Sequence, residues 1–186
     1  MSSLEVFFDC SSPWSYLAFH NIQPMAAECG VSITWKPILV GGVFNAVNPS
    51  VYNSRDEPVP AKQAYSKKDL QDWARYSGLK IIRPSVFPVN SVKAMRICCA
   101  LEGDARLEPF ARAAFAAYWG DDQDISQVPV LRALCERAGL DADGLLAALS
   151  AVSSRSISSY RGLASSGSFL ALNLSCRLAR STTCSS

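Results

Sequence analysis

Residues 4–16 have the sequence LEVFFDCSSPWSY, and this stretch decides the fold. Its first six residues predict a short buried strand, because they are mostly apolar or aromatic and polar residues follow them. A helical pattern then runs from Pro13 to Cys29, and Gly30 is its predicted end. Residues 31–39, VSITWKPIL, alternate in polarity and are rich in β-branched residues, which predicts a second strand. These three elements indicate a βαβ unit with two parallel strands.

The residues after the second predicted strand have a different character. Residues 44–62, FNAVNPSVYNSRDEPVPAK, are polar and rich in proline and asparagine, which predicts a loop. Farther along, apolar residues recur at helical spacing. This pattern predicts helices over residues 66–79, 90–103, 107–120, 125–140 and 141–150. Asn90 or Ser91 is the expected N-cap of the second of these helices, and Ser126 that of the fourth. Pro24 is expected to kink or shorten the first helix of the chain.

The last segment, residues 151–186, differs from the rest of the chain. It holds twelve serines and four arginines but no acidic residue, no proline and no lysine. This composition is typical of a serine-rich tail that builds no core. The abrupt change also indicates a shift of reading frame near residue 150, and we favour this second interpretation. On either interpretation the segment is expected to be irregular.

Composition and charge narrow the functional classes. A chain of 186 residues, 49% of them hydrophobic, suits one domain with a substantial core. The net charge of +2 comes from the arginines after residue 150, which argues against nucleic-acid binding by the rest of the chain. No apolar run approaches the roughly 18 residues that span a bilayer, and no signal-peptide pattern stands at the start. We therefore expect a cytoplasmic protein without membrane contact.

The cysteines and the histidine favour neither disulfides nor a metal site. The chain has seven cysteines, an odd number, and none forms a C-x-x-C pair. This usage is typical of a reducing compartment, in which buried cysteines act as small apolar side chains. The single histidine, His20, lies within the first helical pattern without paired ligands, so no metal site is expected.

Ser12 has a structural and a functional interpretation. As the N-cap before Pro13, it would stabilise the helix by about 1 kcal/mol. A helix N-terminus also attracts anions, including a thiolate. Many redox proteins carry two cysteines at the positions of Ser12 and Ser15, and the serines remove that redox couple. The Ser12 hydroxyl can instead donate a hydrogen bond to an external thiol, for which glutathione is the obvious source in a cytoplasm. Cys10 is the alternative nucleophile, but its place at the strand end favours a structural role.

Four stretches of the chain resemble a known family in order and spacing. They are FFDCSSPWSYLAF, VPAKQAYSKKDLQDWARYSGL, FPVNSVKAMR and YWGDDQDIS with VLRALCERAGLD after it, and together they cover about residues 4–148. The chain resembles the 2-hydroxychromene-2-carboxylate isomerases and the related kappa-class glutathione transferases. The resemblance implies an α/β, thioredoxin-like fold with a large helical insertion. Residues 1–41 would form the first half of the thioredoxin-like domain and residues 42–150 the insertion.

The resemblance also implies a glutathione cofactor and a set of site residues. Ser12 matches the catalytic serine and also binds glutathione, and Trp14 would form an apolar wall beside the sulfur. The other matching residues are Asn53 and Lys62 for glutathione, and Arg55, Asn90 and Ser91 for the substrate. Each of these has a plainer interpretation. Lys62 would be a solvated charge, Asn53 a turn residue, and Asn90 or Ser91 a helix cap.

The reaction that the resemblance implies is an isomerisation without net redox change. The substrate would be a cyclic hemiketal carboxylate from the breakdown of naphthalene-like aromatics, which opens to an unsaturated keto acid. A glutathione thiolate adds to the double bond, rotation follows, and elimination leaves the trans isomer. Relatives also suggest a homodimer. The alternatives are a kappa-like transferase and a non-enzymatic relative with an incomplete glutathione site.

The C-terminal part of the chain departs from the family pattern. The family closes its sheet with two further strands and a final helix, and a Val-Pro stretch contacts glutathione. This chain has no proline after Pro129. Residues 151–186 would therefore stand in place of the second half of the thioredoxin-like domain, with half of the sheet missing or altered. On this basis we expect weak or absent glutathione binding and an exposed sheet edge.

Overall fold

The βαβ unit opens the chain as the sequence predicts. In the computed structural model, which describes residues 2–47 and 59–151, β1 (Ser3–Phe8) and β2 (Ser32–Pro37) flank α1 (Pro13–Glu28). The two strands pair in parallel, with Ser3 opposite Ser32 and Phe8 opposite Pro37. They form a two-stranded sheet within the described residues. The expected α/β class and thioredoxin-like βαβ unit are confirmed.

Helix α1 continues through Pro24 to Glu28, so this proline does not end the helix as the sequence analysis allowed. The helix begins with Pro13 at a position where the missing N–H costs nothing. It ends before Gly30, whose positive φ of 64° suits glycine because the residue has no Cβ.

Aromatic side chains join the βαβ unit to the helical part of the chain. Phe8 and Phe19 lie with ring centroids 5.2 Å apart, and Phe19 stacks on Trp35 at 4.1 Å. Phe115, at the end of α6 (Leu107–Phe115), lies 5.4 Å from Phe19. Tyr16 stacks on the same phenylalanine at 5.0 Å. Burial of these rings ties α1, β1 and α6 into one core.

All five predicted helices are confirmed, with changes at their ends. The remaining helices are α2 (Val40–Val47), α4 (Pro60–Tyr76), α5 (Val92–Ala100), the π-helix η1 (Ala116–Gly120), α7 (Val128–Arg137) and α8 (Ala142–Ala151). Helix α4 starts six residues before the prediction, at a proline that suits a first turn. Helix α2 overlaps residues predicted as a loop, so that prediction is wrong for residues 44–47.

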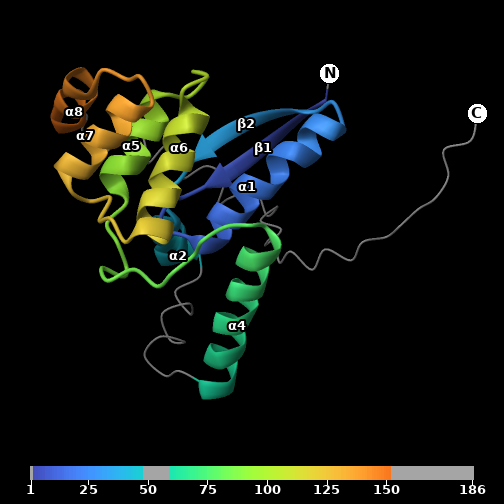
Figure 1. Cartoon of the computed structure of the whole chain (residues 1–186). Helices are drawn as coiled ribbons and strands as arrows, with labels where there is room; N and C mark the ends of the chain where they lie inside the picture. Colours follow the sequence, from blue (N-terminus) through green and yellow to red (C-terminus); the bar gives the residue numbers. More distant parts are fainter. Residues whose placement is uncertain (1, 48–58, 152–186) are drawn as a thin grey trace, which may run out of the picture.

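Helices α5, α6, α7 and α8 gather beside the βαβ unit, whereas α4 extends away from it (Figure 1). Helix α4 buries only Ala74, and its main contact with another helix is to α1. There, Asn21 donates a hydrogen bond of 2.9 Å from Nδ2 to the Ser77 hydroxyl just after α4.

Of the two predicted helix caps, the one at Asn90 or Ser91 is confirmed and the one at Ser126 is wrong. Ser91 occupies the N-cap position of α5, but its side chain makes no cap hydrogen bond. Asn90 instead accepts from the Val92 N–H at 3.1 Å. Ser126 is not the cap of α7, since Gln127 occupies that position. The Asp124 carboxylate accepts from the Ser126 N–H at 2.9 Å, because an aspartate can bond the backbone two residues on.

The cysteines of the described residues are free thiols. Cys10, Cys98 and Cys135 are buried, as expected for small apolar side chains, whereas Cys29 is exposed. No helix in the described ranges is both long and apolar enough to cross a bilayer. The predicted irregular tail begins at residue 151, which is instead the last residue of α8, and the rest of it, residues 152–186, falls outside the described residues.

Candidate functional site at the amino end of α1

The turns after β1 and β2 lie together. Because the strands are parallel, both carboxyl ends lie at one edge of the sheet, and Ile38 donates its N–H to the Phe8 carbonyl at 2.9 Å. The first turn leads into α1 and the second into α2. Ligands of open α/β sheets bind beyond the carboxyl ends of the strands, so this edge is the place to look for a site.

Ser12 is the N-cap of α1. Its Oγ accepts a hydrogen bond from the Ser15 N–H at 3.2 Å, and its own N–H donates to the Asp9 carbonyl at 3.0 Å. The side chain is half-buried. A hydroxyl can accept at its oxygen and donate its proton at the same time, so the cap leaves one O–H donor for another partner. The structural interpretation of Ser12 therefore holds and does not exclude the functional one.

Asp9 is the residue that the sequence analysis missed. Its carboxylate is 1% exposed, and the two oxygens accept from different turns. Oδ1 bonds the Ser11 N–H and Oδ2 bonds the Val40 N–H, each at 2.8 Å. The only signal in the sequence is an aspartate directly after a predicted strand. The prediction that this strand is buried is wrong for most of it, because only Phe8 of β1 is buried.

Cys10 is held on both sides by the helical part of the chain. Its N–H donates to the Met95 sulfur at 3.3 Å, and its carbonyl accepts from the Trp119 indole N–H at 3.0 Å. Its thiol is fully buried beside Cys98. The hydrogen bond with Cys98 and burial raise the pKa of Cys10 well above the usual thiol value. Since the thiolate is the nucleophilic form, Cys10 has a structural role.

Met95 and Trp119 give a structural role to two of the four stretches that resemble the family. Met95 belongs to FPVNSVKAMR and Trp119 to YWGDDQDIS, so each stretch supplies one partner of Cys10. Trp119 lies in the π-helix that follows α6, a feature often found at functional sites. Both residues lie inside stretches that resemble the family, but the sequence pattern predicts neither as a site residue.

The other predicted site residues are spread over the fold. Trp14 lies in the first turn of α1 and is 46% exposed. Ser91 is buried, and its carbonyl accepts from the Met95 N–H at 2.9 Å, which puts it one turn from the residue that contacts Cys10. Asn90 is exposed and serves the local cap described above. Asn53 and Arg55 lie outside the described residues.

Lys62 lies far along α4 from the contact with α1. It is exposed in the first turn of the helix, whereas α4 meets α1 near Ser77, just past its last turn. Fourteen residues separate Lys62 from Tyr76, which is about 21 Å of helix. Figure 1 shows this starting end of α4 pointing away from the body. The role of Lys62 stays a prediction.

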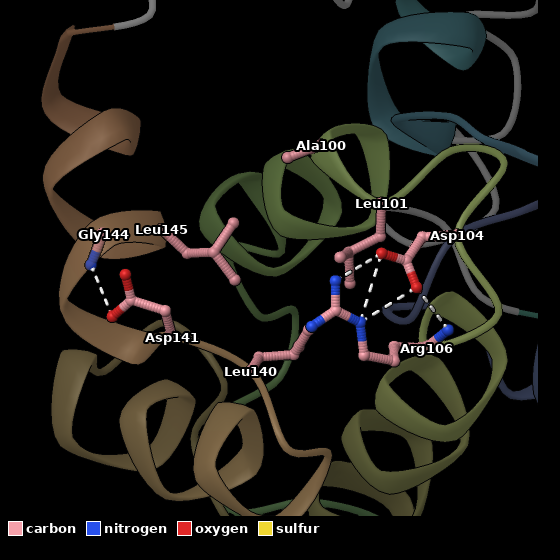
Figure 2. Close-up of a pocket in the computed structure, with 8 residues that line it drawn as sticks. All are labelled: Ala100, Leu101, Asp104, Arg106, Leu140, Asp141, Gly144 and Leu145. Carbon is pink, nitrogen blue, oxygen red and sulfur yellow. Dashed lines mark hydrogen bonds and ion pairs between the residues drawn. The ribbon is translucent and has the colours of Figure 1, made fainter.

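A separate hollow of about 310 Å³ lies between the turn after α5 and the start of α8. Figure 2 shows apolar side chains around it and the ion pair of Asp104 with Arg106 at one side. The lining residues are Ala100, Leu101, Asp104, Arg106, Leu140, Asp141, Gly144 and Leu145. Hydrogen bonds from Arg106 lower the pKa of Asp104 to about 2. Of the predicted site residues that the structure describes, none lines this hollow.

Within residues 2–47 and 59–151 no group of three or more His, Cys, Asp or Glu side chains is arranged to hold a metal ion. The amino end of α1 instead offers the Ser12 hydroxyl and the backbone N–H of Trp14, since Pro13 has no N–H and the Ser15 N–H bonds Ser12. Such donors suit an anion, because the first N–H groups of a helix have no partner within it.

Comparisons with known proteins agree with this geometry. The model of the DSBA-like thioredoxin domain family matches residues 3–161. A 2-hydroxychromene-2-carboxylate isomerase of Pseudomonas putida is 32% identical over 142 residues, which are 74% of this chain and 66% of that protein. The human glutathione S-transferase kappa 1 is 26% identical over 151 residues, 76% of this chain and 64% of that protein. The chain thus spans about two thirds of the length of these relatives.

A solved structure of a relative has a similar fold. The structure of a 2-hydroxychromene-2-carboxylate isomerase superposes with a TM-score of 0.65 at 23% identity. The superposition covers 87% of this chain and 76% of that one. At this identity the likeness concerns the fold, and it supports the arrangement of β1, α1 and β2 followed by helices.

Proposed function

The chain belongs to the DsbA-like thioredoxin family, and we propose that it is a glutathione-dependent isomerase of the 2-hydroxychromene-2-carboxylate type. One observation carries the proposal. Ser12 caps α1 with its oxygen and its O–H has no acceptor among the described residues, while no cysteine stands at the redox positions. The helix end and the hydroxyl therefore suit a sulfur that comes from another molecule.

The residues of the turn fit such a thiol. The Ser12 O–H donates a hydrogen bond toward the sulfur and favours its ionised form. The amino end of α1 adds the equivalent of about half a positive charge. Glutathione, when bound there, supplies the nucleophilic thiolate that the protein itself lacks. Exposed Trp14, in the first turn of the same helix, offers an apolar surface beside the site.

The remaining predicted residues receive their proposed roles mainly from the resemblance to the family. We assign glutathione binding to Asn53 and Lys62, and recognition of a substrate carboxylate to Arg55. Asn90 and Ser91 precede α5, the helix whose Met95 contacts the turn. Their position supports a role at the border of a substrate pocket. A small-molecule substrate, a homodimer and a cytoplasmic location belong to the same proposal.

Two other functions compete with this one. A kappa-like transferase would use the same turn but keep glutathione attached to an electrophile, and the similarity to the human kappa protein supports it. A non-enzymatic relative would lack a complete glutathione site. The two-stranded sheet of the described residues supports this last candidate, because it leaves the sheet edges without further strands.

A titration with glutathione separates these candidates. Ultraviolet absorbance at the thiolate band follows thiolate formation as glutathione is added to the wild type, to Ser12→Ala and to Ser15→Ala. The proposal predicts saturable thiolate formation in the wild type and its loss in Ser12→Ala. Ser15→Ala is the matched control, because it keeps the backbone N–H that Ser12 accepts from. No thiolate in the wild type would indicate the non-enzymatic relative.

The product distinguishes the two enzymes. A hydroxychromene carboxylate incubated with catalytic glutathione should give the trans keto acid while the total free thiol stays constant. A transferase would instead consume one thiol for each electrophile converted. Counting free thiols during the reaction therefore decides between isomerase and transferase.

A further inference from the structure

The Asp9 carboxylate lies between the amino ends of two helices. One oxygen bonds the Ser11 N–H in the turn before α1, and the other bonds the Val40 N–H at the first residue of α2. Asp9 is the one charged residue among the buried residues of the described chain. A buried charge is unfavourable unless it is hydrogen-bonded, so both bonds are needed to keep this carboxylate inside.

The bond to Val40 lets Asp9 act as a cap for α2. The residue before this helix is Leu39, whose side chain has no oxygen to accept from the first N–H groups. Asp9 provides that acceptor from the end of β1, 31 residues earlier in the chain. Its negative charge also suits the amino end of α2.

The carboxylate therefore ties two turns into one unit. Ser11 is the residue directly before the cap Ser12, whose N–H donates to the Asp9 carbonyl at 3.0 Å. A shift of the turn after β2 would therefore displace Asp9, whose carbonyl accepts from the Ser12 N–H. The side chain and the main chain of Asp9 thus fix the amino end of α1 relative to that of α2.

We propose that Asp9 is a positioning residue, which holds Ser12 at the proposed thiol site by bridging the turns after β1 and β2. This inference rests on the proposed function, because it concerns how the same site is aligned. Asp9 does not touch the thiol and acts through Ser11 and Ser12.

Two variants break the bridge in different ways. Asp9→Asn removes the charge and places an amide donor against one of the two N–H groups. Val40→Pro keeps the charge and removes the N–H that Oδ2 accepts from, at a first helical position that tolerates proline. Asp124→Asn is the matched control, because Asp124 makes a similar bond to the Ser126 N–H away from the turn.

Amide hydrogen exchange tests the bridge without any ligand. The proposal predicts that Val40→Pro speeds exchange of the Ser11 and Ser12 amides by about tenfold or more. Asp9→Asn should speed exchange at Ser11, Ser12 and Val40 together. Asp124→Asn should leave all three unchanged. Unchanged exchange at Ser11 and Ser12 in a folded Val40→Pro protein would overturn the proposal.

The acidity of bound glutathione tests the link to Ser12. Both bridge variants should raise the pKa of the bound thiol by about one unit, since the helix end and hydroxyl no longer face it correctly. If Asp9 acted through its charge alone, Asp9→Asn would lower the pKa of the bound thiol and Val40→Pro would leave that pKa unchanged. That result would refute the positioning role. If the wild type binds no glutathione, the proposed function fails, and the exchange measurement still decides whether Asp9 bridges the turns.

Discussion

At the scale of single residues, Ser12 combines a cap with a proposed hydrogen-bond donor. The cap uses the oxygen of the hydroxyl, and the thiol interaction would use its proton. The two roles can be separated by substitution, because some side chains cap a helix without offering a donor.

Ser12→Asp provides this separation. Aspartate is as good an N-cap as serine, so the free energy of unfolding should stay close to that of the wild type, whereas Ser12→Ala should lose about 1 kcal/mol. The aspartate carries a negative charge, so it should abolish thiolate formation with glutathione as fully as alanine does. Urea unfolding and ultraviolet titration measure the two effects. Thiolate formation that survives in Ser12→Asp would contradict the role of the hydroxyl.

The buried thiols predict a pH dependence of stability. Burial raises the pKa of Cys135 and of Cys99 to about 11 each, above the ordinary value of 9.0. A raised pKa in the folded state means that the protonated thiol stabilises the fold below pH 9. This contribution is lost as the pH rises from about 9 to about 11.

Cys135→Ala checks this expectation. The substitution removes one of the titrating groups, so the stability difference between wild type and variant should shrink as the pH rises through that window. Urea unfolding at a series of pH values gives the difference directly. A difference that stays constant from neutral pH to pH 11 would show that Cys135 has no raised pKa.

At the scale of elements, the turn before α1 is held by helices far from it in sequence. Trp119 follows α6 and Met95 lies in α5, and both bond the main chain of Cys10. The helices after the βαβ unit thus support the turn that carries Ser12.

Trp119→Phe tests this support. Phenylalanine keeps an aromatic ring in the core but removes the N–H that bonds the Cys10 carbonyl. We expect a loss of about 1 kcal/mol in unfolding free energy and weaker thiolate formation at Ser12. Trp73→Phe, on the exposed part of α4, is the control and should change neither. If Trp119→Phe lowers stability but leaves the thiolate unchanged, the insertion does not align the site.

At the scale of the whole molecule, the sheet has two strands within residues 2–47 and 59–151. Leu4 of β1 is 38% exposed. An edge strand with an exposed apolar side chain is a template for pairing with another chain.

Leu4→Lys should reduce such pairing. A lysine on an edge strand opposes strand addition, because its charge would have to lose water. Sedimentation at increasing protein concentration should show self-association of the wild type and less of it in Leu4→Lys. Equal association of both proteins would place the contact elsewhere.

The sequence predicted the order and type of nearly every element and the place of Ser12 before α1. It missed α2, because VGGVFNAV is short and contains two glycines, and because its cap comes from Asp9 in another turn. It also missed the start of α4, since proline and polar residues there suit a loop as well as a first turn.

What the sequence determined by itself is local. A strand, a cap and a helix start depend on residues within a few positions of each other, so their patterns appear in the chain. The tertiary structure alone decided which distant residues hold the turn. The partners of Cys10 lie 85 and 109 residues away, and Val40, one of the two partners of the Asp9 carboxylate, lies 31 residues away. No local pattern encodes such pairs, because they form only when packing brings the elements together.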